Sequence, residues 1–460
     1  GTLKSRISVE GLASIFEAAH PQGLDVERSS TPKSLPTQSL SVGPLSQTLP
    51  VDTIETGVEE GKLRLTVTSI EPDLTIPVRV EQQVAPIICR FQAGADRITV
   101  EMTAVDTQPG TWKLGLQEPP KIDAEKLAVD AVSACEPLVD SEGDLVDGLQ
   151  GLLVDYMKRA IRRSTADYVD IAVLEKFGLL RGTTSLTRLS PFGNRRGELR
   201  LVSGVPGDSG IVLDDEGLRA HLDVGASADR AECAPPVDLQ KPSGSAAGEV
   251  ALSELEGTRA NAGIALAETL LDRLARATTL GGFMCQGLDD SNGGQRTIPR
   301  HEAHLADIGL DSAPVSGPLE AVISPGELPG VQLHPENESL SLDWKGLTVE
   351  LYGTVADTRV RLASLRTTVT FRLRPAGDTS GSVDLEVNSI SVREVRLNTP
   401  WATSPDRQTS LKQWTQRLML LVFEESFSLP LPVSPGAPIE LVETRVRPDD
   451  LLLLVRIRQR

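Results

Sequence analysis

The sequence predicts an α+β fold of two elongated modules, each a highly twisted antiparallel sheet wrapped on a long amphipathic helix. Three observations predict it. Strand-like runs with alternating apolar and polar residues recur in both halves. A long amphipathic helix pattern follows these runs in each half, at 145–180 and at 408–425. A Pro-rich polar stretch separates the halves. The 460 residues suffice for a core in each module. We therefore expect a first module at 1–233, a linker at 234–248 and a second module at 249–460.

The first half opens with a strand pattern at 5–10 and a helix pattern at 12–19, which Pro21 ends. The Pro- and Ser-rich stretch at 29–50 has no periodicity, and we expect a loop there. Further strands are expected at 63–68, 76–91, 98–105, 112–116, 198–202, 210–213 and 218–224, and helices at 122–134 and 145–180.

The second half repeats this order. A short strand is expected at 249–253 and a helix at 258–278. Strands follow at 318–324, 339–343, 346–352, 359–374, 382–388 and 390–397, then the helix at 408–425 and strands at 438–446 and 450–457. The alternation within 359–374 slips phase around Ser364, which predicts a β-bulge. Each half thus runs strand, helix, meandering strands, long helix and strands, an internal repeat of architecture about 220 residues long.

The composition narrows the classes of partner. With 46 Lys and Arg against 64 Asp and Glu, the formal net charge is −18, which repels nucleic acid and anionic membranes at long range. Aromatic residues are only 3% of the chain, which argues against a site that stacks on sugars or bases. Small basic clusters at 158–163, 195–196 and 456–460 are interpreted as solvated helix faces and chain ends, with a docking patch for lipid headgroups or a partner as the alternative.

The four cysteines are Cys89, Cys135, Cys233 and Cys285. They lack C-x-x-C spacing and do not stand near His at metal-ligand spacing, so we expect no metal and no cofactor. They fit two disulfides in an oxidising compartment, or equally buried thiols. The sequence has no run of 18 apolar residues and does not open with a signal-like pattern. We expect an extracytoplasmic protein, periplasmic or secreted, from which any signal has been removed.

A long helix and a twisted sheet need not close fully on one another, and the gap between them would be apolar. Such a gap suits an acyl chain or a sterol, because each buried methylene contributes about 0.8 kcal/mol. The alternative is that the helix stripes are plain core. The residues expected to line the gaps are Leu12, Phe16, Leu149, Leu152, Leu153, Tyr156 and Ile161 in the first half, and Ile264, Leu271, Leu274, Trp414, Leu418 and Leu421 in the second.

Four segments in this order resemble the TULIP superfamily, in its bactericidal/permeability-increasing-protein-like branch. They are Arg6-Ile-Ser-Val-Glu-Gly-Leu12, the helix pattern ending in Thr279-Leu-Gly-Gly-Phe283, Leu347-Thr-Val-Glu-Leu-Tyr-Gly353, and Phe427-Ser-Leu-Pro-Leu-Pro-Val433. The resemblance spans nearly the whole chain, although each segment alone has low specificity.

The resemblance implies a boomerang of two modules joined at a Pro-rich centre, with lipid acyl chains held between each long helix and its sheet. It implies a non-enzymatic protein, a monomer that binds phospholipid or another acyl-chain or sterol lipid, and that contacts membranes transiently. It also implies a disulfide between Cys89 and Cys135. Bactericidal members carry a basic first-module tip for lipopolysaccharide. This acidic chain lacks such a tip, so we do not expect that role.

Lipid binding has two alternatives. One is a scaffold or partner-binding protein with the same fold and filled grooves. The other is a serine hydrolase, because Gly207-Asp208-Ser209-Gly210 and Ala18-Ala19-His20 resemble nucleophile and base motifs in the right chain order. His20 falls at a helix end, however, and Ile211 follows the motif, so 206–210 is interpreted as a tight turn.

Three further motifs are interpreted as ordinary surface. His301 and His304 stand three residues apart, which is not the spacing of a zinc-binding helix, and no third ligand is identifiable. Asp289-Asp290-Ser291-Asn292-Gly293 lacks the alternating acids and the distal Glu of a calcium loop. Asn337-Glu338-Ser339 is a formal glycosylation sequon, which matters only in a eukaryotic host.

Overall fold

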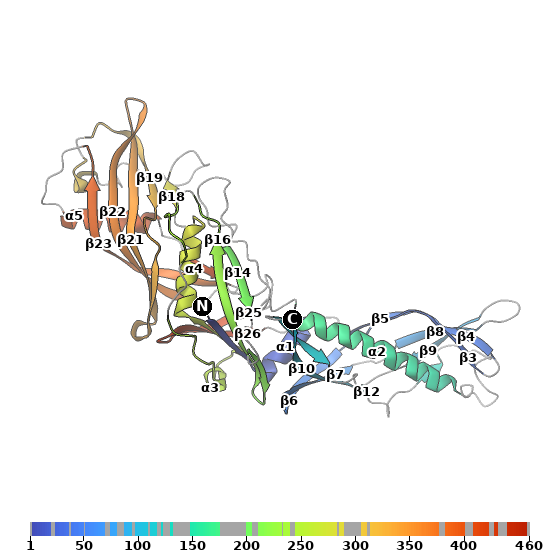
Figure 1. Ribbon diagram of the computed structural model, residues 1–460. Coiled ribbons are helices and arrows are strands. Elements are labelled where there is room, and N and C mark those ends of the chain that lie inside the picture. The colour runs from blue at the N-terminus through green and yellow to red at the C-terminus, as the bar shows by residue number, and fades with distance from the viewer. Residues whose placement is uncertain are drawn as a thin grey trace.

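The computed structural model describes residues 2–19, 24–35, 38–49, 51–69, 74–80, 87–93, 97–108, 111–116, 121–122, 129–131, 148–174, 199–204, 210–231, 233–239, 244–282, 285–288, 305–310, 313–376, 382–400, 408–422, 427–430 and 439–457. These residues form an elongated, bent molecule of helices and antiparallel sheets, which establishes the α+β class (Figure 1). A central sheet lies between two outer regions, one with α2 (Leu149–Leu174) and the other with α5 (Gln408–Val422).

The central sheet contains strands from both ends of the chain. Its order is β14-β16-β1-β17-β26-β25, and β15 also pairs with β16. The strands are β1 (Thr2–Ile7), β14 (Leu199–Gly204), β15 (Ile211–Asp214), β16 (Gly217–Ala228), β17 (Ala262–Ala267), β25 (Ile439–Val446) and β26 (Asp450–Ile457).

This strand order is symmetric about the antiparallel pair β1 and β17. On one side β1 pairs with β16, the last strand before the linker, and on the other β17 pairs with β26, the last strand of the chain. A helix follows each of the two central strands, α1 (Val9–Ala19) after β1 and α4 (Glu268–Leu280) after β17. The two halves of the chain therefore meet through equivalent strands.

The first half adds three sheets around α2. One has the order β11-β10-β7-β6, with β12 also paired to β10; a second has the order β13-β9-β8-β4-β3; and β2 pairs with β5. Their bounds are β2 (Leu24–Arg28), β3 (Thr31–Leu35), β4 (Gln38–Val42), β5 (Leu45–Leu49), β6 (Val51–Glu59), β7 (Lys62–Ser69), β8 (Leu74–Val80), β9 (Ile87–Ala93), β10 (Arg97–Gln108), β11 (Thr111–Leu116), β12 (Lys121–Ile122) and β13 (Val129–Ala131).

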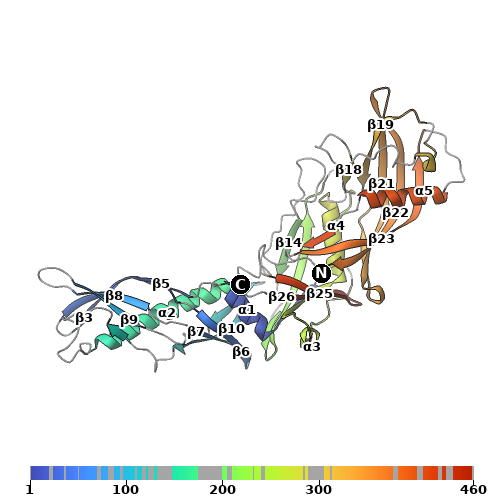
Figure 2. The ribbon, with the colours of Figure 1, turned by 180° about the vertical axis from the view of Figure 1, so that it is seen from behind.

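The second half adds one large sheet, with the order β18-β19-β21-β22-β23-β24 and β20 paired to β21. Figure 2 shows α5 lying across it. The elements are α3 (Leu252–Leu255), β18 (Gln286–Leu288), the 3₁₀ helices η4 (Leu305–Ile308) and η5 (Pro335–Asn337), β19 (Ser316–Ser324), β20 (Gly330–His334), β21 (Ser339–Val355), β22 (Thr358–Ala376), β23 (Ser382–Asn398) and β24 (Phe427–Pro430).

Helix α4 joins the central sheet to this large sheet. The Arg273 guanidinium donates to the carbonyl of Ala226 on β16 at 2.9 Å. On the other side of the helix, the Glu268 carboxylate accepts from the Leu333 backbone N–H at 3.0 Å, and the Asp272 carboxylate accepts from that of Val331 at 3.1 Å. Glu268 and Asp272 stand four residues apart and so share one helix face, which lies against β20.

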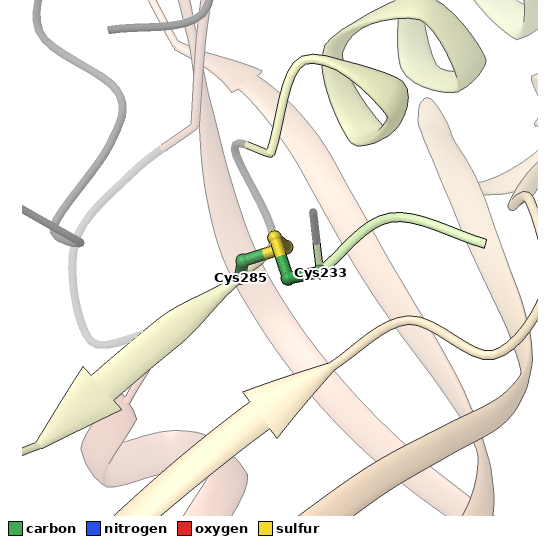
Figure 3. Close-up of a disulfide and its surroundings, with 2 residues drawn as sticks. All are labelled: Cys233 and Cys285. Atoms are coloured by element: carbon green, nitrogen blue, oxygen red, sulfur yellow. A yellow bond between two sulfur atoms is a disulfide. The ribbon is translucent and has the colours of Figure 1, made fainter. Parts of the chain in front are cut away.

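Cys233 and Cys285 form a disulfide, with their Cα atoms 6.1 Å apart (Figure 3). The bond ties the segment after β16 to the residues that follow α4, so it fastens the end of the predicted first module to the second half. Of the pair that the family resemblance implies, Cys89 lies on β9, while Cys135 falls outside the described residues.

Several sequence predictions are wrong. The stretch at 29–50, expected to be a loop, contains β3, β4 and β5. Residues 129–131 of the helix expected at 122–134 form β13. The strand expected at 249–253 is replaced from Leu252 by the short helix α3. The unexpected strands β3, β4, β5 and β13 are short. They gain their stability from pairing with other segments, which a local sequence pattern does not encode.

The helix expected at 258–278 begins only at Glu268, because residues 262–267 form β17. All six residues of β17 are buried, since it is a central strand covered on both faces. Such a strand shows a continuous apolar run without alternation and resembles a buried helix in sequence. Ile264 therefore lies on a strand.

The bulge predicted near Ser364 is confirmed. Leu351 is in register with Ala363 and Tyr352 with Arg361, so Leu362 is an extra residue on β22. Leu362 and Ala363 are both buried, which explains the slipped alternation in the sequence.

Candidate functional site

Helix α2 lies on the first-half sheets with its apolar stripe inward. It packs against β2, β11 and α1. Leu149, Leu153 and Ile161 are fully buried, whereas Asp155 and Arg159 on the opposite face are exposed and form an i,i+4 ion pair. The 3.6-residue period of the apolar positions dictates this orientation. The helix predicted at 145–180 is thus present as an amphipathic helix over a sheet.

Tyr156 is a polar member of the buried face of α2, which also carries Ser164 and Thr165. Its hydroxyl donates to the Gly43 carbonyl at 2.8 Å and lies 3.2 Å from that of Ser29. The Arg28 guanidinium stacks on its ring at 4.5 Å and donates to its backbone carbonyl at 2.9 Å. Burial raises the pKa of the phenol, and Arg28 opposes that rise. The ring is therefore held on two sides, by Arg28 over its face and by the Gly43 carbonyl at its hydroxyl.

A second polar contact lies two helical turns further along α2. The Ser164 hydroxyl accepts from the Glu27 backbone N–H at 3.2 Å. Gly43, the acceptor of the Tyr156 bond, in turn donates its N–H to the Pro77 carbonyl on β8 at 2.6 Å. A Cβ at position 43 would stand 2.8 Å from the Pro77 ring, so only glycine allows this approach. The contacts connect α2 with β2 and β8.

Helix α5 occupies the corresponding position in the second half. It packs against β23 and η4, with Leu411, Trp414 and Leu418 buried. On its outer side Arg417 pairs with Asp307 of η4 at 3.0 Å. Leu421 lies in the last turn of α5, where the structure does not describe its side chain.

The other predicted wall residues lie on different elements. Leu12 and Phe16 are buried on α1, which packs against α2, β6 and the central sheet. Leu271 and Leu274 are buried on α4, which packs against β16 and β20. With Ile264 on β17, the structure places these residues around the central sheet rather than with Trp414 and Leu418 under α5.

The buried stripes are covered by protein atoms. Leu149, Leu153 and Ile161 have exposed fractions of 0%, and Trp414 and Leu418 of 3%. A wall residue of an open, acyl-chain-wide slot would retain accessible surface toward the slot. Leu152, on the edge of the α2 stripe, is only partly buried. Hence a ligand could reach these side chains only if the helix moved away from its sheet.

A pocket of about 470 Å³ lies between the β6–β7 hairpin and the β15–β16 turn. It is lined by Val58, Glu59, Glu60, Lys62, Arg64, Glu101 and Asp215. Arg64 bridges two of the acids, 3.1 Å from Glu59 and 3.3 Å from Glu101. Such a polar lining does not suit an acyl chain.

The residues of the rival hypotheses fall mostly outside the described chain. This holds for His20, Ser209, His301, His304 and the segment 289–293. Asn337 of the sequon ends η5 and is exposed. Within the described ranges, no three His, Cys, Asp or Glu side chains cluster as metal ligands would. No helix in this part of the chain is both long enough and apolar enough to cross a membrane.

No protein-family model and no curated protein matches this chain. Among solved structures, the chain is similar to a lipopolysaccharide binding protein, with a TM-score of 0.45, 11% identity and coverage of 100% of this chain and 99% of that one. It is also similar to P47 from Clostridium botulinum A2, with a TM-score of 0.29, 10% identity and coverage of 99% and 96%. Scores and identities this low do not support a conclusion about function.

Proposed function

We propose that this chain is a non-catalytic lipid-binding protein that takes up acyl chains or a sterol beneath α2, α5 or both. The observation that carries the proposal is the repeated placement of a long amphipathic helix, apolar side inward, over a sheet in each half. Most of the side chains that the two helices turn toward their sheets are aliphatic or aromatic, and such surface suits an acyl chain.

We further propose that the halves act as two lipid-binding modules in a boomerang arrangement, as the sequence resemblance implies. The symmetry of the central sheet about β1 and β17 supports this. Transfer between membranes, with transient contact and a monomeric carrier, belongs to the same proposal. The Cys233–Cys285 disulfide supports an oxidising, extracytoplasmic compartment.

Uptake requires the helix to separate from its sheet. Because the stripe side chains are covered, an incoming chain must replace protein–protein contacts with lipid–protein contacts of the same apolar kind. An acyl chain that leaves a bilayer for this site exchanges one apolar environment for another, and about 0.8 kcal/mol per methylene then opposes its release into water. The proposal therefore needs no preformed tunnel.

Photo-crosslinking tests the proposal directly. The full chain is incubated with vesicles of phosphatidylcholine that contain a photoreactive acyl-chain analogue, illuminated and digested. We expect labelled peptides from α2 or α5. Leu152→Lys, which places a charge on the edge of the α2 stripe, should lower labelling of α2. Gln150→Lys introduces a lysine on the exposed face and should leave it unchanged. Labelling confined to exposed loops, or none, contradicts the proposal.

The burial of the α2 stripe also favours the alternative function, a scaffold or partner-binding protein. The full coverage of the α2 stripe fits a scaffold whose grooves are filled by its own side chains. Native mass spectrometry of protein purified from its own host, followed by lipid extraction, separates the two functions. Stoichiometric co-purified lipid supports lipid binding, and lipid-free protein supports the scaffold.

A further inference from the structure

We infer that Tyr156, held by Arg28 and Gly43, is a latch that controls how fast α2 separates from its sheet to admit lipid. The inference rests on the proposed function and adds the regulation of the first-half site. It depends on the chemical contrast between Tyr156 and the apolar side chains of the buried stripe.

The apolar packing of α2 is non-directional, so a sliding or tilting helix gives it up gradually. The bonds of Tyr156 are directional. Its hydroxyl donates to Gly43 at 2.8 Å, and its carbonyl accepts from Arg28 at 2.9 Å. Both must break before the helix moves by even a fraction of a turn. The bonds of Tyr156 therefore resist a small displacement of α2 from its sheet more strongly than the leucine contacts do.

The partners of Tyr156 are themselves fixed. Gly43 donates its N–H to Pro77 on β8, and the Gln47 side chain bonds both the N–H and the carbonyl of Thr75 on the same strand. The segment between β4 and β5 is thus anchored to the sheet. As a result, Tyr156 connects α2 to a segment that is itself bonded to β8.

A second tyrosine offers a matched control. Tyr352 on β21 also carries an arginine over its ring, Arg359 at 4.1 Å, and its hydroxyl also donates, to Glu350 at 2.9 Å. It lies in the large second-half sheet, on a strand that pairs with β19, β20 and β22. Tyr352→Phe removes the same hydroxyl as Tyr156→Phe, from a ring that also lies under an arginine, in the second half of the chain.

Stopped-flow uptake measures the latch. Vesicles of phosphatidylcholine with a self-quenched fluorescent phospholipid are mixed with the full chain, and dequenching reports uptake. Loss of one hydrogen bond should make Tyr156→Phe about fivefold faster than wild type, which corresponds to about 1 kcal/mol. Arg28→Gln should be faster as well, and Tyr352→Phe should match wild type. Uptake by wild type with equal rates in all variants overturns the latch and leaves the proposed function intact.

Hydrogen–deuterium exchange tests the latch without lipid. Amide exchange in 149–165 should accelerate in Tyr156→Phe and remain unchanged in Tyr352→Phe. Unchanged exchange in Tyr156→Phe overturns the latch, whatever the uptake assay shows. If no form takes up lipid but exchange is faster in Tyr156→Phe, the proposed function is contradicted and the role of Tyr156 in holding α2 is supported. Failure of the proposed function and failure of the latch therefore give different results.

Discussion

Ser5 on β1 lies directly opposite Ile264 on β17, in the antiparallel pair around which the central sheet is symmetric. Equivalent strands of the two halves thus contribute to one sheet, and the stability of either half depends on the other at this junction.

Asp450 should be a large single contributor to stability. It is 1% exposed, pairs with Arg447 at 2.6 Å, and accepts from the backbone N–H of Gly248 at 2.6 Å. Asp450→Ala removes this pair and leaves the Gly248 N–H without its acceptor, while Arg447 keeps its ion pair with Glu254 at 3.0 Å, so we expect a loss of about 2–3 kcal/mol in the free energy of unfolding, measured with urea. Glu443→Gln, which breaks the exposed pair with Arg445, should cost less than about 1 kcal/mol. Equal losses would contradict this reasoning.

The ion pair between Lys4 and Glu249 predicts a pH dependence. The hydrogen bond from Lys4 lowers the pKa of Glu249 below the ordinary value of 4.5. A carboxyl with a lowered folded-state pKa stabilises the protein above pH 4.5, and this contribution disappears as the pH falls through the folded-state pKa.

Glu249→Gln should therefore be less stable than wild type at pH 7, and the two unfolding curves should converge in acid. Because Glu249 is largely exposed, the difference at pH 7 should stay below about 1 kcal/mol. Glu256→Gln controls for the loss of one carboxylate, at an exposed position that has no ion pair among the described residues. A difference that grows in acid would contradict the assignment.

Two glycines should respond to alanine with opposite signs. Gly217, at the start of β16, has a φ of +127°, and a Cβ there would overlap the Ile7 carbonyl oxygen. We expect Gly217→Ala to destabilise the protein by at least about 2 kcal/mol. Gly151 lies on the exposed face of α2 with open space around it, so Gly151→Ala should stabilise by about 1 kcal/mol. Thermal unfolding of both variants checks the signs.

The Cys233–Cys285 disulfide should contribute strongly to stability. It closes a loop of 52 residues, for which the loop-entropy relation gives about 4 kcal/mol. The double variant Cys233→Ser/Cys285→Ser should unfold at a lower temperature than wild type, and wild type in reducing agent should approach the variant. Reducing agent that lowers the unfolding temperature of the double variant as well would show that a second reducible bond, such as the Cys89–Cys135 pair that the resemblance implies, also contributes.

The elements with strong local periodicity were predictable from the sequence. Helix α5 begins at Gln408, where the pattern begins, and β26 spans Asp450–Ile457 as expected. The bulge at Leu362 was predictable because it changes which face the apolar residues occupy. In contrast, the sequence of β17 resembles a helix, since a strand buried on both faces shows no alternation.

The role of Tyr156 could not be predicted. Its place in an apolar stripe was evident, but its hydrogen-bond acceptor Gly43 is 113 residues away along the chain. Local pattern shows that a tyrosine will be buried and not which distant carbonyl will accept its proton. The packing of α2 and α5 on their sheets could not be predicted either. The sequence indicates the apolar faces of the helices but not how closely the sheets fill the space beneath them.

The contact of α4 with β20 has a consequence for solubility. Unpaired N–H groups along a sheet edge are the groups through which one molecule's sheet extends into the next, and natural proteins block such edges. Here the N–H groups of Val331 and Leu333 are occupied by the carboxylates of Asp272 and Glu268. Charged acceptors at this edge prevent a second strand from adding there, so the large sheet is protected from edge-to-edge aggregation along β20.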